Sequence, residues 1–137
     1  MGIQETNAAS EQRRNHPIPG KLPPPCRHAR SYLVRGITVI ELHGTIDLSN
    51  IPEIQAHTDA ATAMPGVRVV VDLRAVEFLD CSTLDLLCRT RRRALERGGH
   101  LTLVCVRPWH LRIPKAADLG TRFAPHATVE DALEYEQ

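Results

Sequence analysis

The sequence contains no apolar run approaching the ~20 residues that a membrane-spanning helix needs. Residues 1–15 lack the basic-then-apolar order of a secretory signal peptide. The formal net charge is only +1, and aromatic residues that stack on bases make up 4% of the chain. We therefore expect a soluble, cytoplasmic protein that contacts no membrane and does not bind nucleic acid directly.

Metal-binding and disulfide patterns are also missing. The four cysteines show no CxxC spacing, and the seven histidines form no HxxxH or HxH pair. Structural zinc needs closely spaced ligands, and cytoplasmic thiols stay reduced. We expect free cysteines, no metal site and no cofactor.

The composition is that of one globular domain with a tail: 137 residues, 42% apolar and 24% charged. Residues 1–30 contain five prolines and carry five cations against two anions, a net charge of +3. Residues 31–137 carry 12 cations against 14 anions, a net charge of −2. A segment with so few large apolar residues cannot offset its ordering entropy. We expect a disordered Pro-rich tail over 1–30 and a folded domain over 31–135.

Apolar periodicity predicts strands that alternate with helices. Strands are expected near residues 32–34, 37–43, 67–73 and 100–106. Helices are expected over 50–63 and 82–97, with short ones near 109–119 and 128–135. Asn50 and Glu53 suggest a capping box, and Phe78 and Phe123 are expected in the core. This order favours an α/β fold, with crossovers onto a mixed, mostly parallel sheet of four to five strands and about four helices.

The central part of the chain carries a family resemblance. A buried VVVDL strand is followed by Phe78-Leu79-Asp80, the turn Cys81-Ser82-Thr83, and an amphipathic helix that ends in Gly98-Gly99. This order resembles the central block of the STAS family, which includes anti-sigma-factor antagonists. The segments 42–47 and 101–104 resemble the flanking turn and strand of that family. The resemblance covers roughly residues 31–135 and implies a single STAS-like domain.

The resemblance also implies a phosphorylation site. Ser82 falls on the serine that a partner kinase phosphorylates, while Asp80 and Asp47 fall on nearby acidic positions of the family. Two departures are Cys81, where the family has serine, and Thr83, where it has glycine; Thr83 is therefore an alternative phosphorylation site. The expected partner contacts are Asp47, Ser49, Asn50, Asp80, Cys81, Ser82, Thr83 and Asp85.

The implied function is that of an anti-sigma-factor antagonist. The unphosphorylated protein would bind an anti-sigma factor with serine kinase activity, and this binding would release a sigma factor. Phosphorylation of Ser82 would end the binding, and a phosphatase would reverse it. The oligomeric state is left open, a homodimer included.

The local pattern at Ser82 has a second interpretation. Ser82 stands three residues before Asp85, which matches a helix N-cap signature. If Ser82 is instead phosphorylated, the helix N-terminus tolerates the charge, because its free N–H groups favour anions. Since Asp80 and Asp85 already make the region acidic, phosphorylation is expected to control binding rather than folding.

Two further function classes remain. One is a STAS module that senses a ligand or binds a partner without phosphorylation, which the two departures favour. The other is a small enzyme, because Asp47, Asp72, Asp80 and Asp85 could hold Mg²⁺ and Cys81 adjoins a helix start. No Gly-rich phosphate loop is present, so we expect no catalysis and expect Asp72 to bind turn N–H groups. The cluster Arg89–Arg97 is either a solvated helix face or a partner-binding face.

Overall fold

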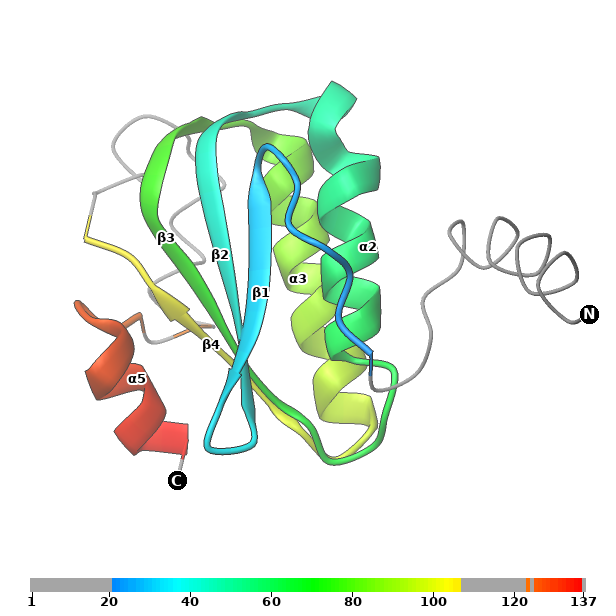
Figure 1. Cartoon of the computed structure of the whole chain (residues 1–137), viewed down its shortest axis with the longest axis vertical. Helices are drawn as coiled ribbons and strands as arrows, with labels where there is room; N and C mark the ends of the chain where they lie inside the picture. The colour runs from blue at the N-terminus through cyan, green and yellow to red at the C-terminus, as the bar shows by residue number, and fades with distance from the viewer. Residues whose placement is uncertain (1–20, 107–122, 124, 137) are drawn as a thin grey trace, which may run out of the picture.

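The computed structural model describes residues 21–106, 123 and 125–136. The four strands among these residues form one sheet. The strands are β1 (Ala29–Val34), β2 (Ile37–Ile46), β3 (Arg68–Leu79) and β4 (His100–Val104). They lie side by side in chain order, with β1 antiparallel to β2 and the other pairs parallel (Figure 1). The mixed, mostly parallel α/β sheet predicted from the sequence is confirmed.

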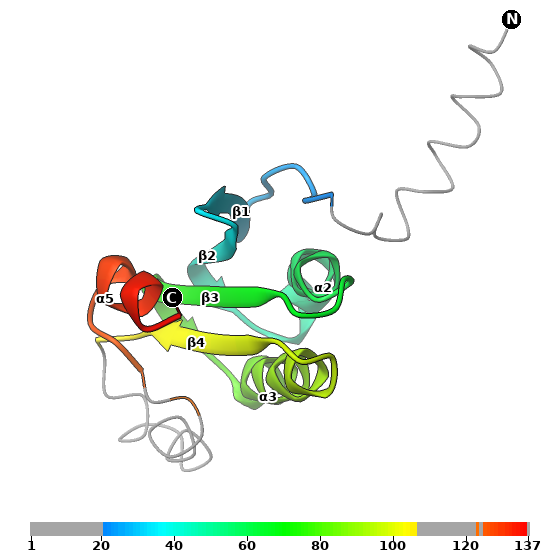
Figure 2. The same cartoon turned by 90° about the horizontal axis from the view of Figure 1, so that it is seen from below.

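Helices cover the two faces of this sheet unequally. They are α2 (Ile51–Ala61), preceded by the short 3-10 helix η1 (Leu48–Asn50), then α3 (Cys81–Glu96) and α5 (Val129–Glu136). The crossover helices α2 and α3 lie together on one face, and α5 lies on the other (Figure 2). The predicted helix near 109–119 lies outside the described residues. Among those described, no helix is long and apolar enough to cross a membrane.

Alternation along β3 produces the two apolar layers. Val69 and Val71 join the larger core against α2 and α3, whereas Val70 joins the smaller core under α5. Successive side chains of a strand point to opposite faces, so a strand with helices on both sides is apolar at every position. This explains why the VVV run marks a central strand.

Helix α3 ends as its two glycines predict. Gly98 has a φ of +79°, a backbone conformation that glycine adopts without strain. A Cβ on Gly99 would lie 2.0 Å from the carbonyl oxygen of Val67. The first glycine therefore turns the chain out of the helix, and the second permits close packing where β3 and β4 begin.

Three strands are longer at one end than the sequence pattern indicates, whereas β4 ends at Val104 and not near residue 106. β1 begins at Ala29 rather than near residue 32, and β3 continues to Leu79 rather than ending at Leu73. Two register shifts interrupt the pairing of β2 with β3, one between Glu41 and His43 and one between Gly44 and Thr45. Such bulges break the alternation of side chains, and the apolar pattern therefore stops before the strand does.

Candidate functional site

The candidate site forms where β2 and β3 end beside each other. Ile46 pairs with Leu79, and the backbone N–H of Asp80 donates to the carbonyl oxygen of Ile46 at 3.3 Å. Asp47 and Asp80 are the next residues along each chain segment. Parallel pairing therefore brings the Asp47 loop and the Ser82 turn to one edge of the sheet.

Asp80 is the N-cap of α3. Its Oδ1 accepts hydrogen bonds from the backbone N–H of Thr83 at 3.2 Å, from the Ser82 hydroxyl at 2.5 Å and from the Thr83 hydroxyl at 3.3 Å. Its backbone is extended, as an N-cap requires. The interpretation of Ser82 as the N-cap is therefore wrong: α3 begins one residue earlier, at Cys81, and Ser82 is its second residue.

The side chains of the turn differ in accessibility. Cys81 and Asp85 are exposed, Ser82 is half-buried, and Thr83 is fully buried. Because Asp80 caps the helix, the Ser82 hydroxyl is not needed to satisfy the first N–H groups of α3. It lies at a helix N-terminus beside a carboxylate, and Ser82 is more exposed than Thr83.

Asp80 is held in its charged form. Partial burial acts to raise the pKa of this carboxyl, but hydrogen bonds from the Ser82 hydroxyl, the Thr83 N–H and hydroxyl, and the Ser82 N–H outweigh burial and lower the pKa below its ordinary value. A phosphate on Ser82 would therefore add its charge next to a carboxylate that is already ionised.

The Asp47 loop has its own capping box. Asp47 Oδ1 accepts from the backbone N–H of Ser49 at 3.0 Å and from its hydroxyl at 2.6 Å, while Asn50 Oδ1 accepts from the N–H of Asp47 at 2.7 Å. The predicted box of Asn50 with Glu53 is wrong, because Asn50 makes no side-chain cap to α2 and Glu53 binds His28. The chain enters α2 through η1 instead, which the sequence pattern did not indicate.

Two exposed apolar side chains flank this edge, and the sequence reasoning missed both. Leu48 follows Asp47 and is 71% exposed, and Phe78 pairs with Thr45 and is 42% exposed. The core placement of Phe78 is wrong, whereas that of Phe123 is confirmed. The register shift before Thr45 places an extra residue in β3, so that Phe78 stays exposed while Leu79 is buried.

Asp72 does not belong to this acidic edge. It is almost fully buried, and it binds Arg74 through Nε at 3.0 Å and Nη2 at 2.9 Å. It also accepts from the backbone N–H of Arg74 at 3.0 Å, and Arg74 belongs to β3 and not to the turn that was expected. Among the described residues, no group of three or more potential ligands could hold a metal ion.

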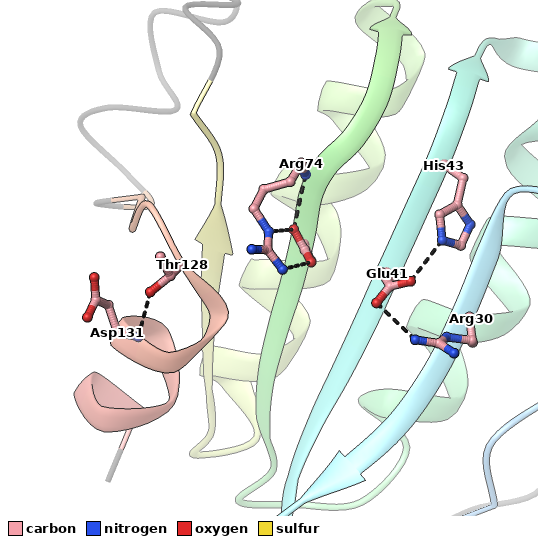
Figure 3. Close-up of polar contacts among 7 residues, drawn as sticks. Arg30, Glu41, His43, Arg74, Thr128 and Asp131 are labelled. Carbon is pink, nitrogen blue, oxygen red and sulfur yellow. Dashed lines mark hydrogen bonds and ion pairs between the residues drawn. The ribbon is translucent and has the colours of Figure 1, made fainter.

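Ion pairs also cross the sheet face that carries α5. Glu41 accepts from Arg30 at 3.1 Å and contacts His43 at 2.9 Å (Figure 3). Both contacts join exposed or half-buried side chains on β1 and β2. This polar row lies on the sheet face opposite the helices α2 and α3, so it is separate from the Ser82 turn.

The arginine cluster of α3 is partly structural. Arg97 Nη1 donates to the carbonyl oxygens of Thr62 and Ala63 at 3.2 and 2.7 Å, where α2 ends. Arg93 pairs with Asp59 of α2 at 3.5 Å, and Arg91 lies 5.7 Å above the ring of Phe123. These contacts favour a solvated helix face, whose arginines pair within the fold, over a partner-binding face.

A family model described as the STAS domain matches residues 29–132. The chain belongs to the STAS domain family. Comparison with curated protein sequences finds no significant match.

Solved structures agree with this assignment. An anti-sigma factor antagonist from Mycobacterium paratuberculosis is 27% identical, with a TM-score of 0.69 over 85% of this chain and 98% of that one. The phosphorylated form of the Bacillus cell fate determinant SpoIIAA is 22% identical, with a TM-score of 0.63 over 80% of this chain and 99% of that one. Its unphosphorylated form, described as an anti-sigma factor antagonist, is 24% identical, with a TM-score of 0.59 over 78% and 96% of the two chains.

Proposed function

We propose that this STAS domain is an anti-sigma-factor antagonist whose binding state is set by phosphorylation of Ser82. The observation that carries the proposal is the position of the Ser82 hydroxyl, at the N-terminus of α3 and 2.5 Å from the ionised Asp80. The Asp47 loop lies at the same sheet edge. The descriptions of the similar mycobacterial and SpoIIAA structures support the same role.

Burial supports Ser82 over Thr83 as the phosphorylation site. The Thr83 side chain is fully enclosed, and its hydroxyl already donates to Asp80. A phosphate there would need space that the packed helix start lacks. Ser82 is half-buried, so rotation of its side chain away from Asp80 exposes the oxygen to an incoming phosphoryl group.

The proposed switch acts on the surface charge. A phosphoserine carries roughly −1.5 to −2 charges at neutral pH. The N–H groups and dipole of α3 stabilise an anion at this end, so the helix persists. Beside Asp80, with Asp47 and Asp85 exposed at the same end, the phosphate repels an acidic partner surface and adds a bulky group at the contact.

The proposed partner is an anti-sigma factor that is also an ATP-dependent serine kinase, and a phosphatase restores the unphosphorylated state. In this role the protein acts by binding. The proposed contact surface comprises exposed and half-buried residues of the Asp47 loop, the end of β3 and the start of α3. These residues are Asp47, Leu48, Ser49, Asn50, Phe78, Asp80, Cys81, Ser82 and Asp85. Thr83 is buried beneath this surface.

Incubation with a purified serine kinase of the anti-sigma-factor class and ATP tests the proposal. Intact mass should show one added phosphate in wild type and in Thr83→Val, and none in Ser82→Ala. Immobilised wild type and Ser82→Ala should capture the kinase, and Ser82→Asp should capture at least about tenfold less, the equivalent of 1.4 kcal/mol. Equal capture by wild type and Ser82→Asp, with no phosphate added to either hydroxyl, would favour the STAS module that works without phosphorylation.

A further inference from the structure

A cysteine, a histidine and a serine meet where the segment before β1 crosses α2. His57 of α2 is only 1% exposed. Its Nδ1 lies 2.6 Å from the hydroxyl oxygen of Ser31 on β1, and its Nε2 lies 3.7 Å from the sulfur of Cys26. The three residues come from three separate segments, and none belongs to the surface that carries Ser82.

The two ring nitrogens of His57 have different partners, so the ring has a fixed orientation. The Ser31 hydroxyl can accept from Nδ1–H or donate to Nδ1, and a ring N–H also donates to the Pro24 carbonyl; in the tautomer with the proton on Nδ1, the lone pair of Nε2 faces the thiol. Burial is the main reason that the pKa of His57 lies below its ordinary value, and the Pro24 carbonyl and Glu53 only partly oppose it. The imidazole is therefore neutral at neutral pH, and burial makes it a weaker base than a free imidazole.

Cys26 is partly exposed, packs against the larger core and lies in basic surroundings. Cys26 is half-buried, and its neighbours Pro25 and Arg27 are exposed. Lys21 and Arg30, on either side along the chain, are exposed cations as well. These charges favour a small reactant that carries carboxylates.

We propose that Cys26 is a nucleophilic thiol, activated by His57, that forms a mixed disulfide with low-molecular-weight anionic disulfides. The thiol proton moves to Nε2 of His57 as the sulfur attacks one sulfur of the reactant. The S–S bond of the reactant breaks, and its other half leaves as a thiolate that takes the proton from the imidazolium. Cys26 is thereby oxidised, and one half of the reactant is reduced to a thiol. Ser31 is a positioning residue, because it acts through His57.

The reaction can be followed with oxidised glutathione as the probe. Trypsin releases Cys26 in the peptide Leu22–Arg27, which contains no other cysteine. We expect this peptide to gain glutathione faster in the native full-length chain at pH 7.5 than in the same chain in guanidinium chloride. A native rate equal to or below the unfolded rate overturns the proposal, whatever the behaviour of any variant.

Matched variants then test the role of the imidazole. His57→Gln should slow the native reaction of Cys26 by about a hundredfold or more, since a hundredfold is the lower end of what a positioned base supplies. His43→Gln should leave the rate unchanged, because His43 contacts Glu41. Ser31→Ala should shift the pH dependence of the rate. An unchanged rate in a His57→Gln variant with native circular dichroism overturns the proposal, and the outcome does not depend on phosphorylation of Ser82.

Discussion

Replacement of Asp80 by alanine is the sharpest test of the site geometry. The change removes the N-cap of α3 together with the acceptor for the Thr83 hydroxyl, which is fully buried. Loss of an N-cap costs about 0.5–2 kcal/mol, and an unsatisfied buried hydroxyl costs about 1–3 kcal/mol. Since the two costs concern neighbouring groups and do not add fully, we expect a total of about 1–3 kcal/mol.

Urea unfolding followed by circular dichroism measures this loss. In a thermal unfolding experiment, each 1 kcal/mol of lost stability corresponds to a shift of roughly 4–8 °C in the midpoint for a domain of this size. Asp80→Asn is the matched control, because asparagine caps helices about as well as aspartate. If Asp80→Ala is as stable as wild type, Asp80 does not cap α3, and the position assigned to Ser82 fails with it.

The charge of Asp80 adds a pH dependence. Its pKa is lower in the folded protein than its ordinary value of 3.8. The resulting stabilisation is present above the unfolded pKa and is lost as the pH falls through the folded pKa. Wild type should therefore lose stability over this acidic range more steeply than Asp80→Asn. Equal slopes for the two proteins would contradict the hydrogen-bond arrangement at Asp80.

Three other outcomes follow from the packing. Leu87→Ala, at a fully buried position of α3, should destabilise the domain by about 2–5 kcal/mol, whereas Leu95→Ala, at a position 42% exposed, should change stability by less than about 0.5 kcal/mol; urea titration separates them, and equal losses would refute the placement of Leu87 in the core and Leu95 at the surface. Leu48→Ala should weaken kinase capture by at least about tenfold, or 1.4 kcal/mol, without changing the urea midpoint, and unchanged capture would remove Leu48 from the contact surface. Because burial lowers the pKa of His57 from 6.5, the unfolded chain binds this proton more tightly, so stability should fall as the pH drops below about 6.5; a His57→Gln variant with the same slope would contradict this assignment.

Structure could be predicted from the sequence most reliably where a single physical effect determines the local conformation. The VVV run of β3 and the paired glycines after α3 each have one strong structural interpretation, and both interpretations held. At the start of α3, Asp80 and Ser82 are both good caps, and only the backbone geometry decides between them. Asn50 was misassigned for a similar reason, because its partner is Asp47 before it rather than Glu53 after it.

The remaining features depend on contacts that local patterns do not encode. Phe78 looks like a core residue, and a register shift in the pairing with β2 leaves it exposed. His57 lies 26 residues from Ser31 and 31 from Cys26 along the chain. Sequence spacing contains no signal for such a cluster, because it arises only when β1 packs against α2.

The order of the strands in the sheet also bears on how the chain assembles. Each strand after β1 pairs with the strand that precedes it along the chain. Only the pairing of β1 with β2 is local, because the two parallel pairings join residues such as Thr38 with Val69 and Val69 with Leu101 across a crossover helix, and such pairings form more slowly than a hairpin. During synthesis, β1 and β2 can form a hairpin before the rest of the domain has left the ribosome, and each later helix and strand then adds to an edge that already exists.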